Sequence, residues 1–237
     1  MTTLSGKKAL VLGGSRGIGA AIVKQLREEG AEVTFTYANS EAPAQNLAAQ
    51  TGANAVRADS ANRDEIIQAV SNAGALDIIV ANAGVVAMGD PLELDPDAVD
   101  HLIDVNVRAP YHAFVEAGRK MNDNGRMIVI GSVNADRIPF PGAAAYSLSK
   151  SALQGMVRGL ARDFGARGIT VNSVQPGPVD TDMNPADGPM RDAMHSFMAI
   201  KRHARADEVA GLVAYLAGSK ADMITGSLQT IDGGFGA

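Results

Sequence analysis

The sequence predicts an α/β fold in which one parallel sheet of about seven strands carries helices on both faces. Short apolar runs alternate with amphipathic stretches of ten or more residues, which is the pattern of successive βαβ units. A glycine-rich turn joins the first apolar run to the first amphipathic stretch. The 237 residues contain no repeat, linker or low-complexity tract. We therefore expect one domain, spanning residues 1–237.

The strands are predicted from short apolar runs, because a strand buried on both faces has few polar positions. They cover residues 8–12, 32–37, 53–58, 76–81, 126–130, 169–174 and 227–231. Helices are predicted where apolar residues recur every three or four positions. They cover residues 18–29, 43–50, 64–73, 97–120, 146–164, 189–199 and 207–216, with Pro110 interrupting the fourth. Residues 177–205, rich in Pro, Asp, Met and Gly, are the least regular and are expected to form a substrate loop or lid.

Composition excludes several classes of function. Apolar residues make up 46% of the chain and charged residues 20%, as in a globular protein and not a disordered one. The net charge of −5 argues against a broad nucleic-acid or membrane surface. Without cysteine there is no disulfide or thiol nucleophile, and the four histidines have no metal-ligand spacing, so no metal is expected. Because neither a membrane span nor a signal peptide is evident, we expect a cytoplasmic protein.

The glycine-rich turn follows the first predicted strand and opens the first predicted helix. Glycine permits the sharp turn and lets a pyrophosphate approach the amino terminus of the helix. In this setting the turn predicts a dinucleotide site, whereas the alternative is a tight turn that only connects two elements. Its residues are Gly13, Gly14, Ser15, Arg16, Gly17, Ile18 and Gly19.

The end of the second strand favours NADP(H) over NAD(H). An NAD site usually places an acid there, on the ribose hydroxyls, but residues 36–40 contain none and end instead with Asn39 and Ser40. Arg16 lies inside the glycine turn, where its guanidinium could pair with a 2′-phosphate. The alternative for Arg16 is a solvated surface arginine.

Further motifs follow in a fixed order along the chain. They are Asp59 after the third strand, Ala81, Asn82, Ala83 and Gly84 after the fourth, Asn106, Ser132 after the fifth, Tyr146 to Lys150, Pro176 and Gly177 with Thr181, and Asp232 to Gly234. In this order the sequence resembles the short-chain dehydrogenase/reductase family over essentially the whole chain. It departs from the family pattern at Gly13, where threonine is frequent, and at Ala81, where asparagine is frequent.

This resemblance implies a Rossmann domain that uses NADP(H) to transfer hydride between nicotinamide and a carbonyl or alcohol substrate. The cofactor contacts that it implies are residues 13–19, Asn39, Ser40, Asp59, Ser60, Asn82, Ala83, Gly84, Tyr146, Lys150, Pro176, Gly177, Val179 and Thr181. For Asp59 a role as a turn or capping acid stays open, and for Thr181 a role as a loop cap.

The implied catalytic residues are Ser132, Tyr146, Lys150 and Asn106. Tyr146 and Lys150 are four positions apart on a helix and so share one face, where the ammonium is expected to lower the tyrosine pKa. Tyr146 would then exchange a proton with the substrate oxygen, and Ser132 would hydrogen-bond that oxygen. Asn106 would tie a water to Lys150, as the family implies. The alternatives are a chance surface pair, a turn serine and a helix residue at a kink near Pro110.

A second function class is a regulatory protein on the same fold. Residues 151–156, 184–186, 188–192 and 198–203 resemble one subgroup of the family that is associated with cyclic-di-GMP and biofilm dispersal. The basic run from Lys201 to Arg205 would then form an anion-binding rim for a cyclic dinucleotide. The alternative is that these charges complement the carboxyl end of helix 189–199.

The expected partners are a small carbonyl or alcohol substrate and further copies of the chain. Ile138, Phe140 and Met183 are expected to line the substrate pocket together with the segment up to Arg205. Small residues on the two long helices, such as Gly155 and Gly159, would permit close approach of a second subunit. Resemblance to the family implies a homotetramer, with a dimer as the alternative.

Overall fold

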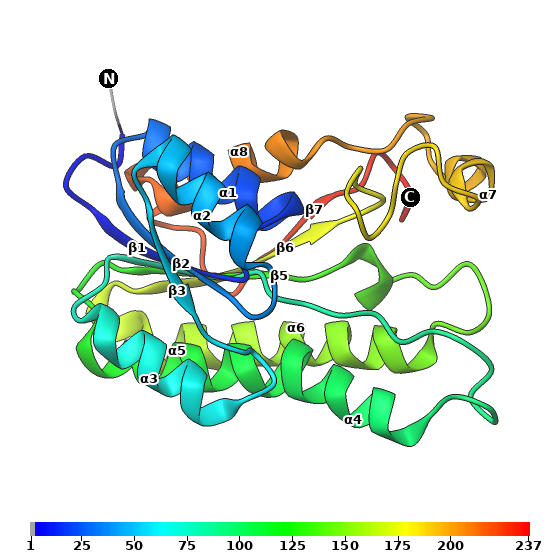
Figure 1. The fold of residues 1–237 in the computed structure, drawn as a ribbon, viewed down its shortest axis with the longest axis horizontal. Helices are drawn as coiled ribbons and strands as arrows, with labels where there is room; N and C mark the ends of the chain where they lie inside the picture. Colours follow the sequence, from blue (N-terminus) through cyan, green and yellow to red (C-terminus); the bar gives the residue numbers. More distant parts are fainter. Residues whose placement is uncertain (1–2) are drawn as a thin grey trace.

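The computed structural model describes residues 3–237, which form a parallel sheet between two layers of helices (Figure 1). The predicted fold is confirmed, with the strands in the order β3-β2-β1-β4-β5-β6-β7. Because the order reverses between β1 and β4, a crevice opens at the carboxyl ends of these two strands. The strands are β1 (Lys8–Leu12), β2 (Glu32–Tyr37), β3 (Asn54–Arg57), β4 (Ile78–Ala81), β5 (Arg126–Ile130), β6 (Thr170–Pro176) and β7 (Leu228–Ile231).

The helices cover both faces of the sheet. On one face lie α1 (Gly17–Glu28), α2 (Glu41–Thr51) and α8 (Ala206–Ala217), and on the other lie α3 (Arg63–Ala73), α4 (Pro96–Ile103), α5 (Ala109–Lys120) and α6 (Ala144–Phe164). Successive residues of a strand point to opposite faces, so Val11 joins the core beneath α1 and α8. Leu10 joins the core beneath α5 and α6, beside Phe114 and Val157.

The long helix predicted over residues 97–120 is three helical segments. A π-helix, η1 (Asp104–Arg108), separates α4 from α5. The irregularity precedes Pro110, which is the second residue of α5, directly after the π-helix. Three short 3₁₀ turns, η2 (Val133–Ala135), η3 (Gly165–Arg167) and η4 (Ser219–Ala221), lie outside the predicted helices.

Residues 177–205 lie at the carboxyl edge of the sheet (Figure 1). They contain one helix, α7 (Arg191–Phe197), which is shorter than the predicted helix 189–199. A parallel bridge joins Val179 to Ala204 and closes the segment at its base. Near its base the Ile200 amide donates to the Gly233 carbonyl at 2.8 Å, which holds the segment to the chain after β7. The described part of the chain contains no helix that is both long and apolar enough to cross a membrane.

Candidate active site

The glycine turn is held against the ends of β2 and β4 by hydrogen bonds of its backbone. The Gly13 amide donates to Thr36 Oγ1 at 3.0 Å, and the Gly14 amide donates to the Thr36 carbonyl at 2.9 Å. From β4, Asn82 Nδ2 donates to the Gly13 carbonyl at 2.7 Å. Gly13 has a φ of 72°, a conformation that is strained for any residue with a side chain. Glycine adopts this backbone conformation without strain.

Two further glycines leave no room for a side chain. A Cβ on Gly19 would lie 2.1 Å from the Gly13 carbonyl oxygen, and one on Gly14 would lie 2.5 Å from the Phe35 Cβ. In residues 3–237, no side chain hydrogen-bonds the backbone amides at the start of α1. These amides and the positive end of the helix dipole form a cradle that fits a pyrophosphate.

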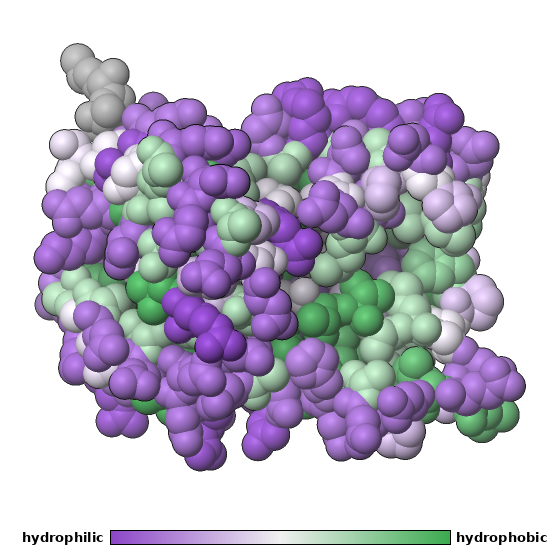
Figure 2. Space-filling view, viewed as in Figure 1, coloured by the Kyte–Doolittle hydropathy of each residue, from purple (hydrophilic) through white to green (hydrophobic). Residues whose placement is uncertain are grey.

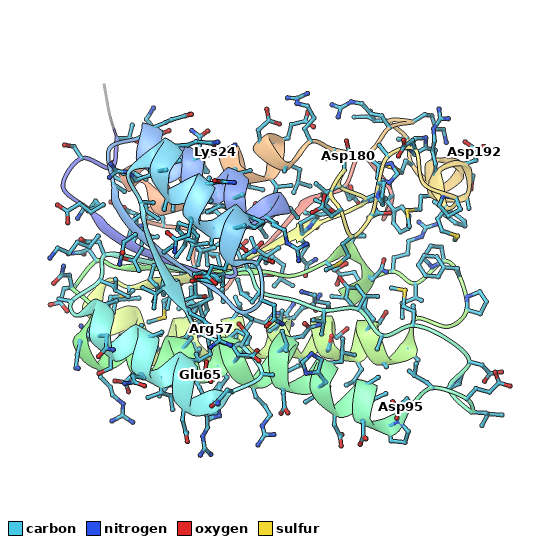
Figure 3. The ribbon with its side chains drawn as sticks, viewed as in Figure 1. Lys24, Arg57, Glu65, Asp95, Asp180 and Asp192 are labelled. Carbon is cyan, nitrogen blue, oxygen red and sulfur yellow. The ribbon has the colours of Figure 1, made fainter. Side chains whose placement is uncertain are left out.

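The loop after β2 is bordered by two arginines. Arg16, in the glycine turn, has its Nη1 3.7 Å from Asp182 Oδ2, and both side chains are exposed. Arg57 ends β3, and its Nε donates to the Ala38 carbonyl at 3.4 Å (Figure 3). Sequence reasoning missed Arg57, although it is the last residue but one of the predicted third strand. The signal was the parallel register, which places Arg57 beside Tyr37 at the end of β2.

Ser132 and Tyr146 meet where β5 ends and α6 begins. Ser132 caps η2, and its Oγ accepts from the Asn134 amide at 3.1 Å. Ser132 lies near enough to Tyr146, in the first turn of α6, to lower the pKa of its hydroxyl. One turn later the buried Lys150 Nζ donates to the Ile130 carbonyl at 3.0 Å and lies 5.9 Å from the centre of the Tyr146 ring. The predicted catalytic side chains thus lie together at the carboxyl edge of the sheet.

The titration of this pair differs from the expectation. Burial raises the pKa of Tyr146, and the hydrogen bond with Ser132 lowers it by less. Burial also lowers the pKa of Lys150 to about 8. The expected lowering of the tyrosine pKa by the ammonium is therefore wrong for the protein alone, because removing the phenolate from water outweighs an ammonium beside the ring.

Asn106 lies in the π-helix η1, beneath the catalytic pair. Its Nδ2 donates to the Val85 carbonyl at 2.9 Å and to Ser149 Oγ at 3.1 Å, while its Oδ1 accepts from the Val85 amide at 2.9 Å. A Cβ on Gly84 would lie 3.5 Å from both Asn106 Oδ1 and Lys150 Nζ. Asn106 therefore fixes the chain after β4 against α6, and the π-helix turns this polar side chain inward.

The remaining predicted cofactor residues lie along the same edge. Asp59 accepts from the Ala61 amide at 2.9 Å and precedes Ser60, whereas the amino-terminal cap of α3 is Asn62. Asp59 is thus a turn acid and not the cap of this helix. Thr181 caps no helix either, and it approaches Gly17, since a Cβ on Gly17 would lie 3.2 Å from Thr181 Cγ2. Before Thr181, the chain runs from Pro176, the end of β6, through Gly177 and the buried Val179.

The basic run is not an open cationic rim. Arg202 forms a bidentate pair with Glu208, with N–O distances of 2.7 and 2.9 Å, and Arg205 Nε lies 2.9 Å from Asp207 Oδ1. Lys201 donates to the Ser196 carbonyl at 3.2 Å, near the carboxyl end of α7. The expectation that the run complements that helix end therefore holds for Lys201 alone. The two arginines pair with acids of the first turn of α8.

Comparisons with known proteins find related sequences over almost the whole chain. The family model described as enoyl-(acyl carrier protein) reductase matches residues 13–236. The chain is 61% identical over 237 residues to the cyclic-di-GMP-binding biofilm dispersal mediator protein of Escherichia coli (strain K12), with all of both chains covered.

Two solved structures carry the cofactor that the sequence predicts. The crystal structure of BdcA in complex with NADPH is 61% identical, with a TM-score of 0.98, and the match covers 99% of this chain and 96% of that one. A short chain dehydrogenase from Burkholderia cenocepacia J2315 in complex with NADP is 47% identical, with a TM-score of 0.97 and coverage of 99% and 100%. The chain belongs to the short-chain dehydrogenase/reductase family.

Proposed function

We propose that this protein is an NADP(H)-dependent oxidoreductase that interconverts a carbonyl compound and its alcohol. The observation that carries the proposal is the meeting of Ser132, Tyr146 and Lys150 next to the glycine turn. Similarity to structures in complex with NADPH and NADP supports the cofactor. When bound, NADP(H) supplies or accepts the hydride at the substrate carbon.

Each catalytic side chain receives a role from its contacts. Tyr146 donates its hydroxyl proton to the carbonyl oxygen during reduction and takes a proton from the alcohol in reverse. Ser132 holds the substrate oxygen, because its hydroxyl lies beside the tyrosine hydroxyl whose pKa it lowers. Lys150 holds the nicotinamide ribose and supplies positive charge near the phenolate. Asn106 positions the chain at Gly84 and Val85 beside Lys150.

The raised pKa of Tyr146 favours the reductive direction near neutral pH. Reduction requires the protonated hydroxyl, which this pKa retains, whereas oxidation requires the phenolate. We expect carbonyl reduction to proceed at pH 7 and alcohol oxidation to increase with pH. Residues 177–205 cover the substrate as a loop or lid.

The test is NADPH oxidation with a panel of carbonyl compounds, in the native protein and in Tyr146→Phe. We expect Tyr146→Phe to lose at least about 100-fold in kcat, because general acid catalysis contributes that much, and to keep its affinity for NADPH. An unchanged kcat in Tyr146→Phe would contradict the proposal.

A second candidate function is cyclic-di-GMP-dependent regulation, which the name of the 61% identical Escherichia coli protein favours. The pairing of Arg202 and Arg205 with acids weakens one of its two supports from the sequence, the basic run, and leaves the resemblance of the loop segments. Calorimetry with NADPH, NADH and cyclic-di-GMP side by side decides between the two. Micromolar binding of cyclic-di-GMP in a protein without carbonyl turnover would favour regulation.

The assembly that we propose is a homotetramer, with a dimer as the alternative. A Cβ added at Gly155 or Gly159 on α6 would meet no atom of the described chain within 4 Å, which leaves room for a close neighbour. Light scattering after size exclusion tests this, and a mass near 24.5 kDa would contradict it.

A further inference from the structure

We propose that the substrate is a large, apolar and uncharged carbonyl compound, which rests on the proposed oxidoreductase function. The side of the cleft beyond Ser132 and Tyr146 is built from three segments, residues 84–94, 133–142 and 177–205. Residues 84–94 touch residues 133–142, since the Gly89 amide donates to the Gly142 carbonyl at 2.9 Å. Residues 177–205 are held to the chain after β7, since the Ile200 amide donates to the Gly233 carbonyl at 2.8 Å.

Most of the exposed large apolar side chains of the described chain lie on these segments. Ile138 is 50% exposed, Met183 64% and Phe197 37%, and the others are Val86, Met88, Leu92, Met190 and Ile200. Figure 2 shows hydrophobic residues bordering a recess on this side of the molecule. A concentration of exposed apolar area around a recess marks a surface that binds an apolar ligand.

A buried apolar cluster lies next to the catalytic serine. Val133, which follows Ser132, packs with Met198 and Phe235 in a buried cluster that Phe140 covers. Phe197 meets Phe235 edge to face, with ring centres 5.8 Å apart. Of these side chains, Phe197 and the half-buried Phe140 are accessible to a molecule whose carbonyl oxygen is held by Ser132.

Charges near the recess are already engaged. Arg202 and Arg205 pair with Glu208 and Asp207, and Arg137 donates to the carbonyl of Ala237. Arg191 lies 3.9 Å from Asp192, the acid labelled on α7 in Figure 3. An anionic substrate would have to lose water without gaining a free guanidinium, which is costly. These contacts favour an uncharged substrate.

The experiment compares three ketones with NADPH: cyclohexanone, 2-tetralone and a carboxylate-bearing 2-tetralone. We expect kcat/KM to be at least about tenfold higher for 2-tetralone than for either of the others. Phe197→Ala should reduce the ratio of kcat/KM for 2-tetralone to kcat/KM for cyclohexanone. The control is Met223→Ala, which changes a 94% exposed methionine before β7, at the opposite edge of the sheet, and should leave the ratio unchanged.

The outcomes separate the two proposals. If ketones are reduced but size and charge make no difference, the substrate class is wrong while the oxidoreductase function stands. If no ketone is reduced, both are overturned.

A different observation carries a second proposal: the structure assigns Arg57 to the 2′-phosphate of NADP(H). It rests on the proposed cofactor. The strand order β3-β2-β1 places the loop of residues 38–40 between Arg57 at the end of β3 and Arg16 after β1. Its Nε contact with the Ala38 carbonyl directs the guanidinium toward this loop.

Both guanidiniums are available to a phosphate. Among residues 3–237, no carboxylate oxygen lies within 4.0 Å of the Arg57 guanidinium, and Arg16 has only the exposed Asp182 at 3.7 Å. Arginine pairs with phosphate through two N–H groups, and two arginines match the charge of a phosphate monoester. Asn39 and Ser40 add polar side chains between them.

The test uses 2′,5′-ADP, which carries the 2′-phosphate, and 5′-AMP, which lacks it. Calorimetry of Arg57→Met should show a loss of affinity for 2′,5′-ADP about tenfold greater than the loss for 5′-AMP. The control is Arg63→Met, on α3, whose guanidinium pairs with Asp64 at 3.0 Å. Arg63→Met should bind both nucleotides as the native protein does.

If Arg57→Met keeps the native preference for 2′,5′-ADP over 5′-AMP, only the role of Arg57 is overturned. If the native protein binds both nucleotides equally, the NADP(H) proposal fails together with it.

Discussion

The two sides of the cleft are built in different ways. On the cofactor side, backbone groups form the surface, and the glycines have no space for a side chain, as at Gly19 beside the Gly13 carbonyl. On the substrate side, exposed side chains such as Met183 and Phe197 form the surface. A surface made of backbone tolerates almost no substitution, whereas one made of exposed side chains can change without loss of the fold.

The largest effect is expected from adding one methyl group to the cofactor side. In Gly19→Ala the new Cβ would lie 2.1 Å from the Gly13 oxygen, so the turn must shift. We expect the free energy of unfolding to fall by about 2–3 kcal/mol and NADPH binding to be lost. Urea denaturation and calorimetry measure both.

Gly211→Ala on α8 is the matched control, because a Cβ there meets no atom within 4 Å. It should raise the free energy of unfolding by about 0.5–1 kcal/mol, since glycine weakens a helix. A Gly19→Ala protein that is as stable as Gly211→Ala and still binds NADPH would show that the cofactor side is more tolerant than the contacts indicate.

Lys150→Met should reduce catalysis and raise stability. We expect kcat to fall at least about 100-fold. Burial lowers the lysine pKa from its ordinary 10.5 to about 8, so below pH 8 the folded state bears the cost of a buried charge. The native protein regains this stability as pH rises from about 8 to 10.5, because the unfolded state then binds the extra proton.

The stability advantage of Lys150→Met is therefore expected to be roughly 3 kcal/mol at pH 7 and to shrink toward pH 10. Urea denaturation of the protein without cofactor at both pH values measures it. An advantage that is the same at both would show that the lysine is not destabilised by burial.

Gln154→Ala should have an intermediate effect at the junction of the two sides. Gln154 Nε2 donates to Asp136 Oδ1 at 2.8 Å and to Gln175 Oε1 at 3.0 Å, which ties the segment after Ser132 to α6 and β6. We expect kcat/KM for the ketone to fall by about three- to tenfold, because Ser132 loses support, with NADPH affinity unchanged. Equal losses for ketone and NADPH would place Gln154 in general stability instead.

The smallest effect is expected from Glu208→Gln. The Arg202 guanidinium and the Arg205 amide lower the pKa of Glu208 to about 2. Its contribution to stability is present above pH 4.5 and is lost as pH falls toward 2, but it is small because the pair is solvated. Acid unfolding should show a shallower loss of stability in Glu208→Gln, with NADPH binding unchanged at pH 7. Weaker NADPH binding would connect this exposed pair to the cofactor side.

The strands and the glycine turn could be predicted from the sequence because both depend on local rules. Apolar runs define buried strands, and a turn that needs a positive φ is recognised in the sequence by its glycine, as at Gly13. The π-helix at Asn106 could not be predicted in this way, because the hydrophobic period of α4 and α5 continues across it. Its position is set by the tertiary contact of Asn106 with Val85.

The partners of exposed side chains were the least predictable part. In the sequence, the run from Lys201 to Arg205 resembles an anion site. The fold places Glu208, at the start of α8, against Arg202 and so pairs its charge. Arg57 was missed for the same reason, since its neighbour Ala38 lies 19 residues away along the chain. The prediction of a lowered tyrosine pKa was wrong because burial cannot be read from a spacing of four residues.

The pairing of β1 with β4 has a consequence for the order in which the molecule forms. Leu10 pairs with Ile79, and the bond from Asn82 to Gly13 spans 69 positions of the chain. Contacts between such distant segments form slowly, because a long loop must close before they contribute. The pyrophosphate cradle is therefore complete only after the two halves of the sheet have joined. A dinucleotide that binds this cradle would act as a late-stage folding ligand and slow unfolding of the central strands.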